Sequence, residues 1–493
     1  MEYRKYAAYR IVSAATGRVL DVPDCTIRSA DADLCADTGC ESQQWFLERQ
    51  ADGKCLLKNI CTSQYLSSGD SLVEVLPEGI SQEYWRLEEA GELCTISSSR
   101  GFLGAGEEGK LSIIPLRSPA SMWRVERVCP DYPVPEPKPA STGRYIPVMQ
   151  MCSLWKDPKA WEPIRPFPKA KPLLGYYEEG TPETIDWEIK MAVDNGIKAF
   201  MPCWYRTAGN EGKPVQASYT HWVDGLQQAR YKEYIQYMLM WENANAVACG
   251  VKDEADLLEN VMPYFIREHF SKEQYFRYRG KPVLAVYLPS LLIEQLGGAG
   301  RARVAFEKAE QLCVEAGLNG LILLGQYCWG GVMEPHLQMK RAGFSYTMSY
   351  HWPSFAEGAL EAGKRDYTDN EILKGHRVCW NGQNMGALPN IINCSVGWNS
   401  APWGHSCTDM EWKLKPRYFY RLLNNAKAEM DNRPKEQMDA DVVFLDNWNE
   451  FGEGHYIMPT AQFGYGYLFA IKRTFADTYE EAGEQGEALH DET

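Results

Sequence analysis

Residues 442–454 read Val-Val-Phe-Leu-Asp-Asn-Trp-Asn-Glu-Phe-Gly-Glu-Gly, an apolar run that passes directly into a polar turn rich in glycine. The run Val442–Leu445 has the length and composition of a strand that is buried on both faces. The turn presents two carboxylates, Glu450 and Glu453, three residues apart and beside aromatic residues. The stretch therefore predicts a core strand that ends in a chemically active loop.

Two acids that lie close together can hold different pKa values, so that one donates a proton while the other accepts one. Cleavage of a glycosidic bond requires such a pair. The alternative is a helix-capping acid next to a solvated glutamate in a loop. Because the pair follows a buried strand and lies among aromatic residues, we predict that Glu450 and Glu453 are catalytic.

Seven further apolar runs of strand length precede this one, and longer helical stretches separate them. Helices are expected at 182–195, 253–270 and 302–316, the first of them beginning with a proline after Thr181. Eight parallel strands with intervening helices predict a (β/α)₈ TIM barrel. A doubly wound sheet is the alternative, but no Gly-x-Gly-x-x-Gly follows the first strand. The eight runs are 146–151, 199–203, 237–241, 283–287, 321–324, 346–350, 391–396 and 442–445.

Polar and aromatic residues follow most of these strands. In a barrel the carboxyl ends of the strands meet at one face, where catalytic residues lie. A face rich in Trp and Tyr with a few polar groups suits an oligosaccharide. The candidates at the later strands are Tyr350, His351, Trp398 and Asn449, although His351 alone could equally be a structural histidine.

The first part of the chain has a different pattern, an internal repeat. Three strands are centred on Trp45, Trp85 and Trp123, with spacings of 40 and 38 residues. Each repeat also opens with a strand, a turn and a second short strand. Short strands and turns with a period near 40 predict an all-β module of three equal parts. The module resembles the ricin-type β-trefoil lectins.

That resemblance implies one sugar pocket per repeat, made by an Asp and by a Gln-x-Trp strand. Only the first repeat has both, as Asp21 with Gln43 and Trp45. The second and third repeats have Glu83 and Ser121 in place of the Gln. The resemblance thus implies at most one ordinary sugar site, and a purely structural trefoil is the alternative.

The composition shift between the two parts predicts the domain boundaries. Residues 1–128 form the β-trefoil, and 129–144, with a proline at every second or third position over much of its length, form an extended linker. Residues 145–480 form the (β/α)₈ domain, and 481–493 form an acidic tail. The expected fold is therefore multidomain, all-β followed by α/β.

The composition also excludes some partners. The net charge of −15 disfavours nucleic acid, which needs a basic surface. The 16 Trp and 28 Tyr favour an oligosaccharide or polysaccharide. None of the 15 cysteines forms a Cys-x-x-Cys pair, so we expect no zinc site, and no cofactor is predicted. Disulfides in the first domain are compatible with the sequence but not required by it.

No apolar run reaches the 18 residues that a membrane-spanning helix needs. The first residues, Met-Glu-Tyr-Arg-Lys-Tyr, lack the apolar core of a signal peptide. We expect a secreted, periplasmic or cell-surface protein whose signal peptide is not part of this sequence, and a cytoplasmic location is the alternative. The sequence leaves the oligomeric state open.

Six pieces of the second domain occur in a characteristic order. They are Leu174-Gly175-Tyr176-Tyr177, Ile185-Asp186-Trp187-Glu188-Ile189-Lys190, Asn195-Gly196-Ile197, Trp204-Tyr205, Trp241-Glu242-Asn243-Ala244-Asn245 and Trp448-Asn449-Glu450-Phe451-Gly452-Glu453-Gly454. Together they resemble the WbsX-like family, which is related to glycoside hydrolase family 99, the endo-α-mannosidases. Family 99 has an Asn-Glu-Trp-x-Glu-Gly segment, and Phe451 stands here in place of its Trp.

The resemblance implies a retaining glycosidase that acts on α-linked glycans, with mannose as a candidate sugar. Glu450 would take the proton of the sugar 2-hydroxyl, which attacks its own anomeric carbon to give an anhydro-sugar. Glu453 would act first as an acid and then as a base. The substrate-binding positions that the resemblance implies are Tyr177, Trp204, Tyr205, Trp241, Glu242 and Asn245.

Two other functions remain as alternatives. WbsX-like chains are often described as glycosyltransferases, and the triplets Asp31-Ala32-Asp33 and Asp439-Ala440-Asp441 have the Asp-x-Asp form of a metal-dependent nucleotide-sugar site. The first triplet falls in the trefoil and the second precedes the eighth strand, so we interpret both as solvated turns. The other alternative is a carbohydrate-binding protein without catalytic activity.

Overall fold

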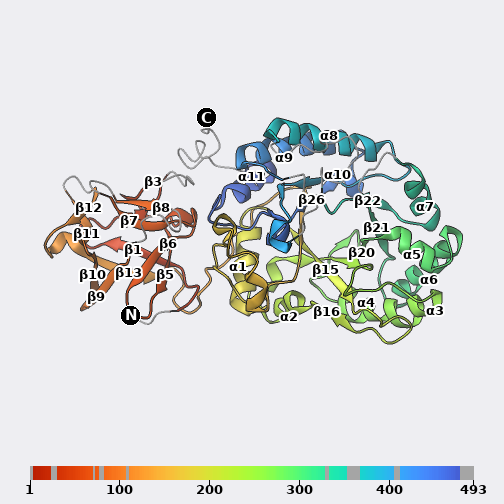
Figure 1. Cartoon of the computed structure of the whole chain (residues 1–493), viewed down its shortest axis with the longest axis horizontal. Helices are drawn as coiled ribbons and strands as arrows, with labels where there is room; N and C mark the ends of the chain where they lie inside the picture. The colour runs from red at the N-terminus through yellow and green to blue at the C-terminus, as the bar shows by residue number, and fades with distance from the viewer. Residues whose placement is uncertain are drawn as a thin grey trace.

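A computed structural model of the chain describes residues 4–23, 30–69, 73–76, 83–106, 110–327, 332–351, 367–404 and 411–477. The acidic tail predicted at 481–493 lies outside these residues. Strands fill the first part of the chain, and the second part combines a parallel sheet with surrounding helices (Figure 1).

Three similar groups of antiparallel strands build the first part. The long pairs are β1 with β13, β5 with β6, and β9 with β10, and the hairpins are β2 with β4, β7 with β8, and β11 with β12. This threefold arrangement confirms the predicted β-trefoil. The strands are β1 (Tyr9–Ser13), β2 (Val19–Asp21), β3 (Ala30–Asp31), β4 (Asp33–Cys35), β5 (Trp45–Arg49), β6 (Cys55–Asn59), β7 (Tyr65–Ser68), β8 (Val73–Leu76), β9 (Arg86–Ala90), β10 (Leu93–Ser98), β11 (Gly101–Ala105), β12 (Leu111–Ile114) and β13 (Met122–Arg127).

The three repeat tryptophans form the centre of the trefoil core. Trp45, Trp85 and Trp123 have no exposed surface. Each donates its indole N–H to a backbone carbonyl of its own repeat, those of Leu20, Leu66 and Leu103, at 3.0, 3.0 and 2.8 Å. A buried indole needs such an acceptor, because an unpaired N–H in a core is costly. The repeated Trp therefore marks a repeated structural contact.

Eight parallel strands form the sheet of the second part. Their order is β22-β21-β20-β18-β15-β14-β26-β23, and a parallel bridge between Thr347 and Asn390 joins the two edges. The sheet is thus a closed barrel, as predicted, and the doubly wound alternative is wrong. The strands are β14 (Ile146–Met151), β15 (Ala199–Arg206), β18 (Leu239–Glu242), β20 (Lys281–Val286), β21 (Ile322–Gln326), β22 (Tyr346–Met348), β23 (Asn393–Ser395) and β26 (Val442–Asp446).

Short strands extend this sheet or form small ladders beside it. They are β16 (Ala217–Ser218), β17 (Gln236–Tyr237), β19 (Arg277–Tyr278), β24 (Gly397–Trp398), β25 (Trp412–Lys413), β27 (Asn449–Glu450) and β28 (His455–Tyr456). The pair β27 and β28 is antiparallel and encloses the turn that carries the two predicted catalytic glutamates.

Helices surround the barrel (Figure 1). Prolines begin α1, α5 and α9, where a missing N–H costs nothing, and a capping box of Thr368 and Glu371 begins α8. The helices are α1 (Pro182–Val193), α2 (His221–Gln228), α3 (Glu254–Asp256), α4 (Met262–Phe265), α5 (Pro289–Gln295), α6 (Ala299–Glu315), α7 (Glu334–Ala342), α8 (Asp369–Asn384), α9 (Pro416–Asp431), α10 (Met438–Asp441) and α11 (Gly466–Phe475). Two π-helical segments, η7 (Leu257–Val261) and η8 (Ile266–Phe270), continue α3 and α4.

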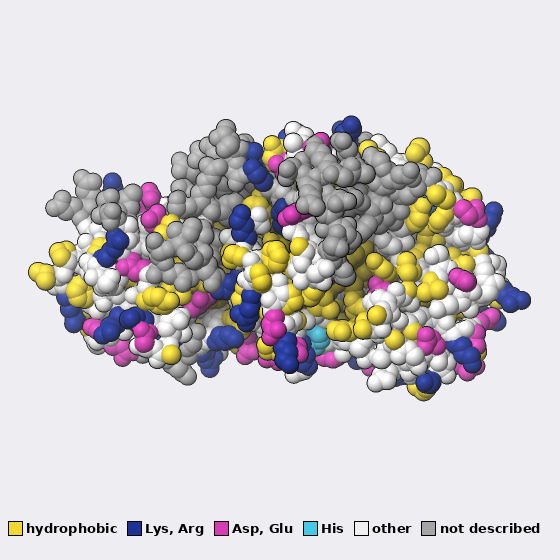
Figure 2. All heavy atoms as spheres, viewed as in Figure 1, with side chains coloured by type: hydrophobic (Ala, Val, Ile, Leu, Met, Phe, Trp, Pro, Cys, Tyr) yellow, Lys and Arg dark blue, Asp and Glu magenta, His cyan; other side chains and the backbone are white. Residues whose placement is uncertain are grey.

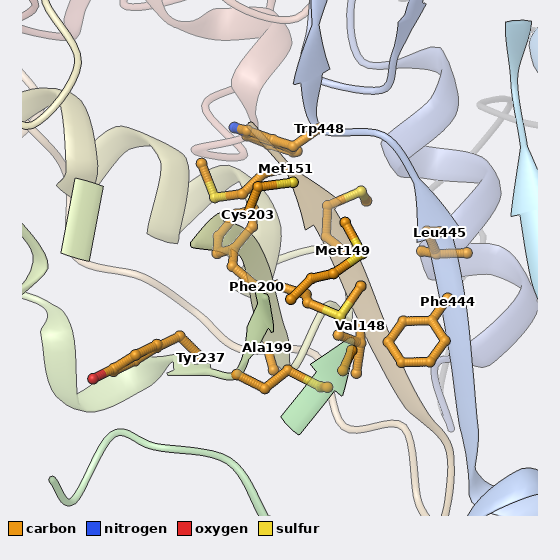
Figure 3. Close-up of a cluster of buried hydrophobic side chains, with 14 of the residues drawn as sticks. Val148, Met149, Met151, Ala199, Phe200, Cys203, Tyr237, Phe444, Leu445 and Trp448 are labelled. Atoms are coloured by element: carbon orange, nitrogen blue, oxygen red, sulfur yellow. The ribbon is translucent and has the colours of Figure 1, made fainter. Parts of the chain in front are cut away.

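Apolar side chains of neighbouring strands pack beneath the site. Figure 3 shows side chains of β14, β15 and β26 in one buried cluster, with Trp448 at the end of the strands. Phe200 contacts the Trp448 ring edge-on, with the ring centroids 5.2 Å apart. The packing of these strands therefore fixes the start of the loop that carries Glu450 and Glu453.

The trefoil and the barrel contact each other directly. Trp187 of α1 packs edge-on against Phe46 of β5, with centroids 5.2 Å apart, and donates its indole N–H to the carbonyl of Tyr6 at 2.8 Å. Lys58 Nζ donates to the carbonyl of Leu173 at 2.8 Å. The proline-rich residues 129–144 lie against α1, since the amide of Ala140 donates to the carbonyl of Val193 at 2.9 Å.

Among the helices that the structure describes, none combines the length and the apolar character that a membrane crossing needs. The cysteines it describes are all free thiols, so the described part of the first domain contains no disulfide. On the face shown in Figure 2, basic and acidic side chains lie interspersed over both parts of the molecule.

Candidate active site

The predicted catalytic pair lies just beyond the carboxyl end of β26. Glu450 ends β27, Glu453 ends the 3₁₀ turn η10 (Phe451–Glu453), and the chain returns as β28. Gly454 closes the turn with a φ of +75°, and a Cβ there would lie 2.7 Å from the amide nitrogen of Asn399. The left-handed backbone and the close neighbour both require glycine at this position.

Glu450 is buried in a pocket of weakly polar groups. Its side chain accepts a hydrogen bond from Tyr350 Oη at 3.0 Å. Tyr350 Oη also lies 3.0 Å from Cys152 Sγ and accepts from Asn447 Nδ2 at 2.9 Å. Burial, together with the charge of Glu453, raises the pKa of Glu450 to about 7. A carboxylate with this pKa is a stronger base near neutral pH than an ordinary glutamate.

Glu453 has a different environment. Its side chain is 27% exposed, and its Oε2 lies 3.0 Å from Nε2 of His455. The other ring nitrogen of His455, Nδ1, lies 2.7 Å from Oδ1 of Asp446. His455 therefore stands between two carboxylates, one from the end of β26 and one from the catalytic turn.

This position sets the charge of His455. A carboxylate accepts hydrogen bonds, so each ring nitrogen that faces one carries a proton. Burial lowers the pKa of His455, but the carboxylates of Asp446 and Glu453 more than offset that effect and raise the pKa to about 10. His455 is thus an imidazolium at neutral pH.

Asp446 is the buried centre of this group. Its Oδ2 accepts from Ser395 Oγ at 2.6 Å and lies 2.9 Å from His351 Nδ1. Although burial opposes ionisation, the neighbouring His455 and His351 hold the pKa of Asp446 well below its ordinary value. Asp446 is therefore a fixed negative charge behind His455.

His351, Asp446 and His455 also lie close enough together to be considered as metal ligands, with candidate ligand atoms within 4.8 Å of one another. However, the carboxylate already contacts a nitrogen of each histidine at hydrogen-bond distance, 2.7 and 2.9 Å. Such distances describe shared protons. We therefore interpret these residues as a hydrogen-bonded chain.

Three of the predicted substrate positions approach Glu450. Tyr350 binds it directly, as described above. Tyr205 of β15 pairs with Glu242 on the neighbouring strand β18. Burial is the main cause that raises the pKa of Tyr205, and the charges of Glu450 and Glu242 raise it further. Burial raises the pKa of Glu242 to about 6. The structure thus places these side chains around Glu450 at the barrel end.

Trp398 lies beside two histidines of this group. Its ring centroid is 5.5 Å from that of His455 and 4.6 Å from that of His351. His351 has no exposed surface and its Nδ1 faces Asp446, so a substrate contact of His351 stays a prediction. Asn245 lies on the exposed loop after β18, where its side chain accepts from the amide of Val247 at 2.8 Å.

Trp204 and Trp241 do not reach the site. They contact each other at 6.0 Å between centroids and pack on Phe265 of α4, on the outer side of the sheet. Successive residues of a strand point to opposite faces, so Tyr205 and Glu242 turn inward where these tryptophans turn outward. Both tryptophans are buried there, and a sugar contact of either one stays a prediction.

Tyr177 and Asn449 are also buried, and their sugar contacts stay predictions. Tyr177 is 1% exposed and packs edge-on against Trp161. Asn449 uses its side chain internally, because Oδ1 accepts from the amide of Cys152 at 3.0 Å and Nδ2 donates to Glu179 at 3.0 Å. Asn449 thereby fixes the backbone next to Glu450.

Two buried glutamates that the sequence did not single out hold the catalytic loop. Glu179 binds Asn449, as described above, and also accepts from the amide of Trp155 at 3.1 Å. Glu188 of α1 accepts the indole N–H of Trp448 at 3.2 Å and that of Trp222 at 2.8 Å. Burial and the charge of Glu179 raise the pKa of Glu188 to about 8.

A cavity of about 420 Å³ adjoins the catalytic turn. It offers aromatic surfaces and several polar groups, a combination that suits a sugar. Lys413 holds the turn from this side, since its Nζ donates to the carbonyl of Gly454 at 2.9 Å. Residues lining the cavity include Asn399, Glu411, Trp412, Phe451, Tyr456 and Gln462.

Two of the three residues of the predicted trefoil pocket contact each other. Gln43 Nε2 donates to Asp21 Oδ2 at 2.9 Å, and both side chains are buried. Trp45 is a core residue with no exposed surface, and its sugar contact stays a prediction. In the second repeat Glu83 accepts from the amide of Ser68 at 2.5 Å, a different polar pair.

His455, Asp446 and Cys152 were missed as functional residues. His455 directly follows the Glu-Gly end of the motif, and Asp446 is the first polar residue after the strand Val442–Leu445. Both signals are visible in the sequence, but only the return of the chain as β28 brings His455 back beside Asp446 and Glu453. Cys152, which lies 3.0 Å from Tyr350 Oη, has no feature in the sequence that points to the site except its position directly after β14.

Comparison with known proteins agrees with this architecture. Residues 167–471 match the family described as "Glycosyltransferase WbsX", and residues 2–71 match the ricin-type beta-trefoil lectin domain-like family. The chain is 22% identical over 323 residues to the uncharacterized protein WxcX of Xanthomonas campestris pv. campestris. That match covers 62% of this chain and 43% of WxcX, so the chain spans less than half the length of this curated relative.

Two solved structures are among those that this chain is similar to. The GH99 endo-alpha-mannosidase from Bacteroides thetaiotaomicron is 14% identical, with coverage of 68% of this chain and 97% of that one and a TM-score of 0.46. The Macrolepiota procera ricin B-like lectin, solved with lactose, is 14% identical, with coverage of 26% of this chain and 99% of that one and a TM-score of 0.22. Since the WbsX match extends over more than half of its residues, this chain belongs to the WbsX family.

Proposed function

We propose that the protein is a glycoside hydrolase that cleaves α-linked oligosaccharides or polysaccharides with retention of configuration. The observation that carries this proposal is the contrast between two carboxylates on one turn at the barrel end. Glu450 is buried with a pKa raised to about 7, whereas Glu453 is partly exposed and bonded to a charged histidine. Two carboxylates in such different environments suit a reaction that needs one base and one acid.

In the first step Glu450 removes the proton of the sugar 2-hydroxyl, and the resulting oxygen attacks the anomeric carbon. The bond from this carbon to the glycosidic oxygen breaks, and Glu453 gives its proton to the leaving alcohol. The product is a 1,2-anhydro-sugar. The raised pKa of Glu450 supports its role as the base, because proton abstraction is favoured when the base has a pKa near the working pH.

In the second step a water molecule loses a proton to the carboxylate of Glu453 and attacks the anomeric carbon. The bond from that carbon to the 2-oxygen breaks, and Glu450 returns its proton to this oxygen. Both glutamates regain their starting states. Two inversions at one carbon give net retention, and no cofactor takes part in either step.

The test is a panel of polysaccharides and oligosaccharides, with α-mannans first, read by the release of reducing ends. α-Mannosides suit the mechanism because their 2-oxygen stands trans to the leaving group. We expect hydrolysis of at least one α-linked glycan. If β-linked glycans alone are cleaved, the proposed linkage is wrong, and if none is cleaved, the proposed hydrolase activity is wrong.

The family description favours a glycosyltransferase as the second candidate. Of the two Asp-x-Asp triplets, the second lies at the amino end of β26, opposite the catalytic turn, where Asp441 accepts from Tyr278 at 2.8 Å. A transferase would be stabilised thermally by a nucleotide sugar with Mn²⁺. The absence of any shift with a panel of nucleotide sugars would exclude this candidate.

We propose in addition that the trefoil binds sugar at Asp21 and Gln43. The Asp21→Ala variant is expected to weaken retention on immobilised glycans by about tenfold or more, because it removes a buried carboxylate and leaves the Gln43 amide without this hydrogen-bond partner. Hydrolysis of a short substrate should stay unchanged. Unchanged retention on every glycan to which the wild type binds would leave the trefoil a structural module.

A further inference from the structure

We propose that Asp446, His455 and Glu453 form a proton relay in which His455 stores the proton that Glu453 gives to the leaving group. This inference rests on the proposed function and adds a positioning residue to it. It arises from the arrangement of the three side chains.

The geometry defines the direction of the relay. His455 Nδ1 donates to Asp446 at 2.7 Å, and Nε2 donates to Glu453 at 3.0 Å. Asp446 has no exposed surface, whereas the Glu453 side chain is 27% exposed. The proton on Nε2 thus points from a buried charge toward the exposed carboxylate, and Glu453 is the member that can pass it to a substrate.

The charge balance explains why Glu453 can act as an acid. At rest the proton between His455 Nε2 and Glu453 Oε2 lies on the histidine. When a bound sugar excludes water from Glu453, its carboxylate becomes more costly to keep charged. The proton of Nε2 then moves to Glu453 Oε2, His455 becomes neutral, and Asp446 remains ionised. Return of the proton from Glu453 to His455 after the second step restores the starting state.

Other titratable groups that face His455 support this state. The His351 ring lies 5.0 Å from that of His455 between centroids, and the Tyr350 ring lies 5.7 Å away. Burial lowers the pKa of His351, so His351 is neutral beside the charged His455. The cluster contains the carboxylates of Asp446 and Glu453 and one imidazolium, that of His455, and Glu450 lies nearby. Apart from His455 and His351, no basic side chain within the described residues forms an ion pair with Asp446 or Glu453.

The first test needs no substrate. In a ¹⁵N-histidine titration by NMR, both ring nitrogens of His455 should stay protonated until about pH 10, the pKa given above. His269 and His376, whose burial lowers their pKa values to about 4, serve as internal references that are neutral over the same range. The Asp446→Asn variant should lower the midpoint of His455. Titration of wild-type His455 near an ordinary value of about 6.5 would overturn the relay.

The second test is the pH profile of kcat/KM. His455→Gln can still donate a hydrogen bond to Glu453 but stores no proton. We expect the alkaline limb of its profile to move to lower pH by about one unit or more, with about 10²-fold lower kcat/KM at the wild-type optimum. His269→Gln, a matched change of a buried histidine on η8, should keep the wild-type profile.

The outcomes separate the relay from the proposed function. If no glycan is cleaved, the function fails while the NMR titration still decides the protonation of His455. If glycans are cleaved and a folded His455→Gln variant keeps the wild-type alkaline limb, the function stands and the relay is wrong. If that variant does not fold, the wild-type titration alone decides.

Discussion

Replacing Glu453 by glutamine is expected to lower the rate of glycan hydrolysis by about 10³-fold while the substrate still binds. The amide has nearly the same shape, but it can neither give a proton to the leaving alcohol nor take one from water. Because Glu453 is partly exposed at the end of η10, the substitution should not disturb the fold. The measurement is reducing-end release together with calorimetric titration of the substrate.

Two further variants sharpen this test. Glu450→Gln should lose activity to a similar extent, because it removes the base. Glu307→Gln, on the exposed face of α6, makes the same chemical change far from the barrel end and should keep wild-type activity. Full activity in Glu453→Gln would contradict the assignment of the catalytic pair.

Replacing Asp256 by alanine is expected to lower the free energy of unfolding by about 3–5 kcal/mol. Asp256 and Arg206 form a fully buried, two-point ion pair, with N–O distances of 2.8 and 2.9 Å. Arg206 also donates to the carbonyls of Gly250 and Asn210 at 3.0 and 2.8 Å. The substitution leaves the buried guanidinium without its counter-charge, and the loops after β15 and β18 lose their common anchor.

Chemical denaturation of the Asp256→Ala and wild-type proteins measures this effect. The control is Glu307→Ala, which breaks the exposed pair with Arg303 and should change the unfolding free energy by less than about 1 kcal/mol. A loss of similar size in both variants would show that the buried pair adds no more than a surface pair.

The barrel could be predicted because its signals are local. The strands at 146–151 and 442–446 are largely buried on both sides, and apart from Gln150 and Asp446 they consist of apolar residues. The helix at 182–193 begins with Pro182, which has no amide proton to leave unpaired. The trefoil could be predicted because each of its repeats needs the same buried tryptophan.

The site could be predicted only in part, because it depends on which way each side chain points. In the pair Trp204-Tyr205, the sequence does not show that the tyrosine turns inward and the tryptophan outward. The role of His455 depends on the antiparallel return of β28, which pairs it with Glu450. Neither fact follows from residue types or spacing, since the first depends on how neighbouring strands and helices pack and the second on how the short turn between β27 and β28 folds.

The most direct test of the central claim, that two carboxylates hydrolyse an α-linkage with retention, is ¹H NMR of the product formed first from a cleaved α-glycan. We expect the α-anomer to appear first and the β-anomer to grow in later by mutarotation. A 2-deoxy analogue of the same substrate should not be cleaved. Appearance of the β-anomer first, or ready cleavage of the 2-deoxy analogue, would contradict the proposed mechanism.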